Sequence, residues 1–277
     1  WWILVANAWM QYPVGQEFNP DTMRFEMTSF LDVALSPFAV DKFFHTVTSS
    51  WIVGAIFTVG VSSWYLLKHR EQKLAKASIK ISGIVGLVAS VLAAITGDNS
   101  AYMVSSVQPM KLAAMEALYN GGKSQPLTIV AAVNPFEQPD YVNEQHAPLR
   151  IAVPNGLSIF ATRSLNGYVP GVNNLINGYT HPDGSTVPSF AEKIASGKKA
   201  IVALQKYREA TAGLKNGAAL PAEAKAQLST LKDNIKNFGY GYIKDVNDLV
   251  PHIPLTFYAF RAMVGLGMLF ILFFLVV

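Results

Sequence analysis

Three long apolar runs constrain this chain more than any other feature of its sequence. They cover residues 38–67, 78–97 and 255–277. A transmembrane helix needs about 20 predominantly apolar residues, so each run is long enough to cross a bilayer. Only 14% of the residues are charged, against about 25% in ordinary soluble domains. The sequence therefore predicts an all-α polytopic membrane protein with a bundle of three full spans.

A shorter apolar run, WWILVANAWM, opens the chain. No basic stretch precedes it and no small-residue cleavage site follows it, which argues against a signal peptide. We interpret it as the end of a fourth transmembrane helix, and the chain as an internal piece of a larger polytopic protein. A connection at about residues 12–37 separates it from the first full span.

The short connection at residues 68–77 decides the orientation. It is rich in basic residues and holds a single acid, Glu71. The positive-inside rule places such a connection in the cytoplasm. The connection at 12–37 and the long segment 98–254 are then expected on the extracytoplasmic side.

The long segment (residues 98–254) is too polar to lie in the membrane, and a connection of this length usually carries a function. It is expected to be mainly helical. A helix is predicted from Pro109 to Tyr119, and Ser189 and Glu192 have capping-box spacing before another. The stretches PLTIVAAVNPF and LRIAVPNGLSIFATRS are compatible with strand or loop.

Composition excludes several function classes. The formal charge of +4 is small, and no nucleic-acid partner is expected. The absence of cysteine excludes disulfides, thiolate metal sites and cysteine nucleophiles. No motif supports a nuclease, kinase or hydrolase.

Two ionisable residues, His45 and Arg261, lie inside the spans beyond the interfacial turns. Such residues are costly in lipid and favour a functional interpretation. For His45, an interhelical hydrogen bond and a cofactor ligand remain equally open. For Arg261 alone, pairing or an extended side chain that reaches the interface is favoured.

Met263 lies at nearly the same expected depth as His45, since His45 is about seven and Met263 eight or nine residues into spans entered from the same face. An imidazole and a thioether at one level on different helices can form the axial pair of a haem iron. Methionine in an apolar helix is more often core filler. The pattern alone therefore only suggests a haem.

Several segments taken together resemble subunit I of the cytochrome bd-type quinol oxidases of bacterial respiratory membranes. They occur in the order of that family and are WILVANAWMQYPVGQEFN, KFFHTV, GDNSAYMVSSVQPMKLAAMEA, IFATRS, GYGYI and FYAFRAMVGLG.

The resemblance implies roles for individual residues. His45 and Met263 are implied to be the iron ligands of a low-spin b haem, and Arg261 to help hold that haem in its reduced form. Lys111 and Glu116 are implied to act in quinol oxidation within the long segment, and Asp98 matches an acid at its start. Lys111 and Glu116 are expected about 140° apart on one helix, flanking a headgroup.

The resemblance also implies what the complete protein contains. A second b haem and a haem d, where oxygen is reduced, are expected outside this chain, because the family's ligands for them lie on helices before and after this segment. The spans here hold no acid near the bilayer middle, so this piece by itself offers no proton relay to an oxygen site. Expected partners are membrane lipid, ubiquinol or menaquinol, a second large subunit and small single-span subunits. The complete protein is expected to be located in the bacterial inner membrane. This piece alone is not expected to be a competent oxidase.

Two other classes of protein remain open. One is a bis-histidine membrane cytochrome b that anchors a dehydrogenase, which needs a second histidine on a helix outside this chain. The other is a transporter or receptor with a large outer domain and no redox role, which predicts no visible absorption.

Overall fold

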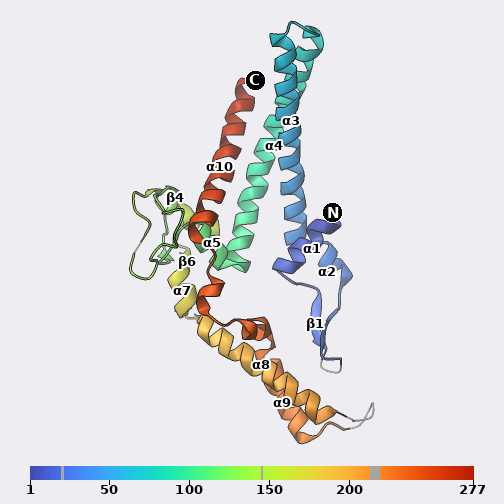
Figure 1. Cartoon of the computed structure of the whole chain (residues 1–277), viewed down its shortest axis with the longest axis vertical. Coiled ribbons are helices and arrows are strands. Elements are labelled where there is room, and N and C mark those ends of the chain that lie inside the picture. The colour runs from blue at the N-terminus through green and yellow to red at the C-terminus, as the bar shows by residue number, and fades with distance from the viewer. Residues whose placement is uncertain (20–21, 145, 213–218) are drawn as a thin grey trace.

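The computed structural model describes residues 1–19, 22–144, 146–212 and 219–277. Its two longest helices, α3 (Pro37–Leu67) and α4 (Gln72–Val107), pack together and run antiparallel. The third long apolar helix, α10 (Ile253–Val276), lies on the other side of α4 (Figure 1). Within the described residues, these three helical regions are long and apolar enough to cross a membrane. The predicted helical membrane fold is confirmed.

The helix starts follow from local capping chemistry. The Ser36 side chain accepts a hydrogen bond from the backbone N–H of Ala39, and Pro37 occupies the first turn of α3, where a missing N–H costs nothing. The His252 ring accepts from the backbone N–H of Leu255 at the start of α10. Both helices therefore begin at fixed points on the same side of the bundle (Figure 1).

Helix α4 is longer than the predicted span. It continues as regular helix beyond Gly97 to Val107, so Asp98 lies inside a helix rather than at the start of a loop. The physical reason is tertiary: Asp98, Asn99 and Ser100 all find hydrogen-bonding partners on neighbouring elements. In the sequence these polar residues suggest a helix end. In the structure their tertiary hydrogen bonds allow the helix to continue without interruption.

The N-terminal elements pack beside the start of α3. Val5 and Ala8 of α1 (Trp2–Gln11) are buried against Phe38 and Ala39. The antiparallel hairpin of β1 (Gln16–Asn19) and β2 (Arg24–Met27), and then α2 (Phe30–Ala34), connect α1 to α3.

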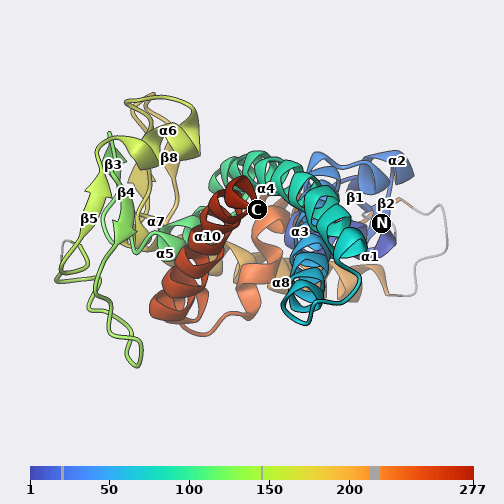
Figure 2. The same ribbon diagram turned by 90° about the horizontal axis from the view of Figure 1, so that it is seen from above.

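The long segment folds as helices, most of them short, and two-stranded antiparallel ladders. Figure 2 shows its ladders and α6 on the side of the bundle opposite to α1 and α2. The elements are α5 (Pro109–Met115), β3 (Gly122–Lys123), β4 (Leu127–Val130), β5 (Ile151–Val153), α6 (Gly156–Thr162), β6 (Tyr168–Val169), α7 (Val172–Asn177), β7 (Tyr179–Thr180), β8 (Thr186–Val187), α8 (Phe190–Thr211), α9 (Ala222–Asn234), η1 (Ile235–Tyr242) and η2 (Val246–Leu249). The ladders are β3–β6, β4–β5 and β7–β8.

A core beneath α5 and α7 ties the long segment to α10. Ala113 and Tyr119 are buried in one cluster with Val172 of α7 and with Ile253 and Phe257 of α10. At the other end of α10, Phe274 packs among Ile52 and Ala89. Helix α10 is therefore held at both of its ends.

Helices α8 and α9 form a hairpin that extends away from the long helices (Figure 1). The capping box of Ser189 and Glu192 that begins α8 is present as predicted. Where α8 meets η1, Gly197 and Gly241 bring the two backbones into contact. A Cβ on Gly241 would lie 2.5 Å from the carbonyl carbon of Gly197.

Gly241→Ala is therefore expected to destabilise the α8–η1 contact by about 1–3 kcal/mol, because the added methyl group meets backbone atoms that cannot rotate away. Limited proteolysis of the intact protein should show faster cleavage in the hairpin. Gly239→Ala is the matched control, since nothing lies within 4 Å of a Cβ at Gly239. Equal cleavage of both variants would contradict this account.

Candidate functional site

A buried ion pair joins the long segment to α10. Glu116, which follows α5, is 1% exposed, and Arg261 lies two turns into α10 with a side chain 16% exposed. Arg261 Nη2 lies 2.6 Å from Glu116 Oε2, and Nη1 lies 3.1 Å from Oε1. Two parallel bonds of this kind fix the orientation of both groups. The pair connects residues 145 positions apart in the chain.

A second arginine adds to the charge around Glu116. Arg150 is partly buried and is held by Thr128 Oγ1 at 2.8 Å from its Nε and by the Pro126 carbonyl at 3.0 Å from its Nη2. Burial raises the pKa of the Glu116 carboxyl, while Arg261 and Arg150 act in the opposite direction. The buried carboxylate of Glu116 therefore lies under the influence of two cations, one of them directly bonded to it.

His45 lies on α3 with its ring against α4. Its Nδ1 is 3.0 Å from Thr96 Oγ1. A Cβ on Gly97 would lie 3.2 Å from His45 Cε1, so the missing side chain makes room for the ring. A hydrogen bond at Nδ1 fixes the orientation of an imidazole and leaves Nε2 available as a ligand atom.

Met263 lies on a face of α10 that no other described element covers closely. Its side chain is 53% exposed, and a Cβ on Gly267, one turn later, would meet nothing within 4 Å. Met263 lies ten residues after the start of α10 and His45 eight residues after the start of α3. At 1.5 Å per residue these depths are about 15 and 12 Å. The two side chains lie at similar levels, on helices that flank α4.

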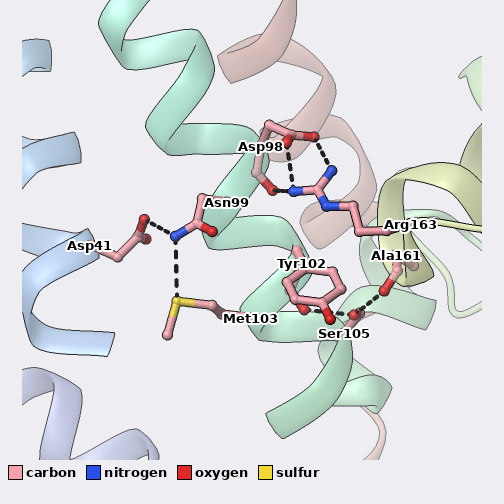
Figure 3. A network of polar contacts seen from close by, with 8 residues as sticks. All are labelled: Asp41, Asp98, Asn99, Tyr102, Met103, Ser105, Ala161 and Arg163. Atoms are coloured by element: carbon pink, nitrogen blue, oxygen red, sulfur yellow. Dashed lines mark hydrogen bonds and ion pairs between the residues drawn. The ribbon is translucent and has the colours of Figure 1, made fainter. Parts of the chain in front are cut away.

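The turns of α4 after Gly97 carry polar contacts to both sides (Figure 3). Towards α6, Arg163 forms an ion pair with Asp98 at 2.6 Å, and its guanidinium lies 4.9 Å from the centre of the Tyr102 ring. Towards α3, the buried carboxylate of Asp41 accepts hydrogen bonds from Asn99 and Ser100. Asp98 is thus part of an ion pair that is about half exposed.

Lys111 lies elsewhere, beside a small cavity of about 140 Å³ between α1, α3, α4 and α5. Asp41, Lys42, Ser100 and Gln11 also line this cavity. The Gln11 Oε1 atom is buried without a hydrogen-bond partner within the described residues. The cavity therefore offers an acceptor, a carboxylate and two ammonium groups in one place.

Comparison with known proteins identifies the family. The family model described as cytochrome bd terminal oxidase subunit I matches residues 1–277. The chain belongs to this family. It is 36% identical over 274 residues to "Cytochrome bd-II ubiquinol oxidase subunit 1" of Escherichia coli (strain K12), which covers 98% of the chain and 51% of that protein. It is 34% identical to "Cytochrome bd ubiquinol oxidase subunit 1" of Bacillus subtilis (strain 168), over 73% of the chain and 43% of that protein.

The chain thus spans about half the length of these curated cytochrome bd relatives. The fold also resembles the bd oxidase structure from Geobacillus thermodenitrificans, with a TM-score of 0.54 over 96% of this chain and 54% of that one. At 19% identity this likeness shows the fold alone. Family and helices together make this a multi-pass bacterial membrane protein.

The structure brings some of the predicted site residues together and separates others. Glu116 and Arg261, predicted for different roles, are directly paired. Lys111 lies beside a different cavity, and Asp98 is paired with Arg163. Helix α5 ends at Met115, and Glu116 caps it with its N–H still bonded to the Leu112 carbonyl; Lys111 and Glu116 lie on the same helical turns but have different neighbours.

Two charged residues near the site were missed from the sequence. Asp41 was counted with the interfacial turn of its span, although it is only 8% exposed. Its position four residues before His45, one helical turn away, was the available signal. Arg150 lies in an irregular stretch where no periodicity indicates which side chain points inward.

The side chains present fit a haem of the kind that the cytochrome bd resemblance implies. His45 and Met263 provide the nitrogen and sulfur donors of a low-spin axial pair. The His45 ring is already oriented by Thr96, and the face of α10 beside Gly265 and Gly267 is open. The Nε atom of Arg261 is buried and has no partner within the described residues, which leaves a donor for an anionic substituent.

Proposed function

We propose that this chain forms the quinol-oxidising, electron-entry part of a respiratory cytochrome bd-type oxidase. Quinol would be oxidised at the long segment on the extracytoplasmic side, and His45 and Met263 would hold a low-spin b haem that supplies the electron acceptor. The rest of the complete subunit would hold the second b haem and haem d, where oxygen is reduced to water. The proposal rests on the family and on the buried ion pair between the long segment and α10.

The b haem, when bound, would supply a one-electron acceptor next to the quinol site. The chain's own residues would hold it: His45 through Nε2, Met263 through its sulfur, and Arg261 through the free Nε donor. A cation close to the haem favours the form that carries the additional electron. Arg261 would therefore stabilise the reduced state while keeping Glu116 in place.

The Glu116–Arg261 pair is the observation that carries this proposal. A buried ion pair has a large desolvation cost and is weak evidence for stability, so a functional reason for it is favoured. Quinol oxidation releases two protons, and a carboxylate can accept one of them. Because Arg261 lies two residues before Met263, proton acceptance and electron transfer would take place at adjacent positions.

Lys111 and Asp98 have supporting roles in this proposal. Lys111 can donate to a quinol oxygen from the neighbouring cavity, where Asp41 and Lys42 lie. Asp98 would position α6 against α4 through Arg163. Neither residue touches Glu116, so each is expected to affect quinol binding more than the electron acceptor.

Glu116→Gln tests the proposal. It is expected to lower quinol oxidation by the complete oxidase roughly tenfold or more, because an amide cannot accept the proton. Oxygen reduction driven by an artificial electron donor should be almost unchanged. The carboxylate accepts a proton only when ionised, so quinol oxidation by the wild type should fall as the pH drops through the raised pKa of Glu116. The variant should lose this dependence.

Equal loss of both activities in Glu116→Gln would contradict a quinol-specific role. Family membership favours the oxidase over a bis-histidine anchor and over a non-redox transporter or receptor. A membrane preparation without any b-haem absorption would contradict both haem proteins and favour the non-redox transporter or receptor.

The partners and location follow as part of the same proposal. The complete protein would lie in the bacterial inner membrane with a second large subunit and small single-span subunits. Its substrate would be ubiquinol or menaquinol, and two relatives carry ubiquinol in their names.

A further inference from the structure

Arg150 lies on the inner face of an extended stretch whose aliphatic side chains face outward. Ile151 and Val153 of β5 are 63% and 45% exposed. Successive side chains of a strand point to opposite faces, so Arg150 and Ala152 lie on the inner face. The preceding residue, Leu149, has a φ of 49°, a costly conformation for a bulky side chain and one that is found at functional sites. Burial of apolar surface alone would not place a guanidinium inside and aliphatic groups outside.

The guanidinium of Arg150 is held by two oxygen atoms in and before β4. Its Nε lies 2.8 Å from Thr128 Oγ1, and its Nη2 lies 3.0 Å from the Pro126 carbonyl oxygen. Thr128 is 2% exposed and lies opposite Ala152 in the β4–β5 ladder. Neither ion pair among the described residues includes Arg150. Its orientation is therefore fixed by neutral acceptors on a paired strand.

Thr128 also connects Arg150 to Glu116. The backbone of Thr128 forms a hydrogen bond with the Glu116 carboxyl group, while its side chain accepts from Arg150. Arg261 of α10 and Arg150 are the two charged side chains that act on Glu116 within the described part of the chain. Arg261 already forms two parallel bonds with the carboxylate, so Arg150 is not needed to pair it. The cluster thus holds two positive charges against one negative charge.

The additional cation opposes the effect of burial on Glu116. Burial raises the pKa of this carboxyl group, and Arg261 and Arg150 both lower it. A carboxyl group that is already protonated cannot accept a proton from a substrate. A second cation therefore extends the pH range in which the buried group can act as a base.

We propose that Arg150 is a positioning residue for quinol oxidation, which keeps the Glu116 carboxylate oriented through Thr128 and ionised through its own charge. Arg150 acts on the reaction only through Glu116. This inference rests on the proposed function and gives the β4–β5 ladder a role in the control of the proton acceptor.

Infrared titration of the complete oxidase tests this inference without a measurement of turnover. The C=O band of the protonated Glu116 carboxyl group is identified by its loss in Glu116→Gln, and its midpoint pH is then followed in the other variants. Arg150→Gln removes a nearby positive charge, so the midpoint should rise by about one pH unit. Arg150→Lys keeps a charge and should lie closer to the wild type. Thr128→Val removes the acceptor for Nε and should raise the midpoint by less than Arg150→Gln.

The pH profile of quinol oxidation should move in the same direction. The wild type loses activity as the pH falls through the pKa of Glu116, because the carboxylate becomes protonated. In Arg150→Gln this loss should begin about one pH unit higher. A purely structural role of Arg150 would lower activity at every pH and leave the position of the profile unchanged.

Arg208→Gln is the matched control, because Arg208 is exposed on α8 and does not act on Glu116. A wild-type midpoint in Arg150→Gln, or an equal shift in Arg208→Gln, would overturn the inference. If Arg150→Gln fails to assemble, Thr128→Val decides the question, and an unchanged midpoint there overturns it.

The proposed function fails separately. Normal quinol oxidation by Glu116→Gln would contradict the role of Glu116, while the infrared midpoint would still show whether Arg150 controls that carboxyl group. Impaired oxidation by Glu116→Gln with an unshifted midpoint in Arg150→Gln would leave the proposed function in place and overturn the role of Arg150.

Discussion

His45→Ala is expected to abolish the low-spin b-haem band in the reduced-minus-oxidised spectrum of membranes that contain the complete protein. Alanine has no donor atom, and no second histidine of this chain lies inside its spans. Met263→Leu should shift the band or convert it to a high-spin form, because one axial ligand remains. Methionine ligation raises the reduction potential of a haem, so any haem retained in Met263→Leu should also have a lower potential.

Two control variants separate ligand loss from general damage. His69→Ala changes an exposed histidine in the connection between α3 and α4. Met268→Leu changes another methionine of α10, which is 57% exposed. Both should keep the wild-type band. An unchanged band in His45→Ala would rule out the ligand assignment, whatever the activity of the variant.

The membrane fold could be predicted because apolar length is a local property of the sequence. Residues 38–67, 78–97 and 255–277 needed no tertiary information to be recognised as helices. The end of the second helix could not be predicted in this way. Asp98 and Asn99 read as a boundary, and only their partners Arg163 and Asp41, far away in the chain, show why the helix continues.

The candidate site was predictable as a set of residues but not as an arrangement. Resemblance to the family indicated Lys111, Glu116 and Arg261 one by one. The pairing of Glu116 with Arg261 depends on how the long segment folds back over α10. Helical spacing rules predict contacts three or four residues apart, not contacts between residues 145 positions apart.

Removal of one partner of the Glu116–Arg261 pair is the second large effect that we expect. Glu116→Leu leaves Arg261 facing Arg150 without the carboxylate, and Arg261→Leu leaves an acid that is 1% exposed without its partner. Breaking a buried ion pair in this way costs about 3–5 kcal/mol. We expect the apparent Tm of the purified protein, followed by circular dichroism, to fall by roughly 10 °C in each variant.

The double variant Glu116→Leu with Arg261→Leu distinguishes pairing from mere loss of packing. When both charges are removed, no uncompensated group remains, so the double variant should be more stable than either single variant. The Asp98–Arg163 pair is the control, because its side chains are 46% and 42% exposed. The same cycle there should give at most about 1 kcal/mol. If the two Glu116–Arg261 single losses simply add in the double variant, the residues act independently, and the ion pair cannot couple the long segment to the helix that carries Met263.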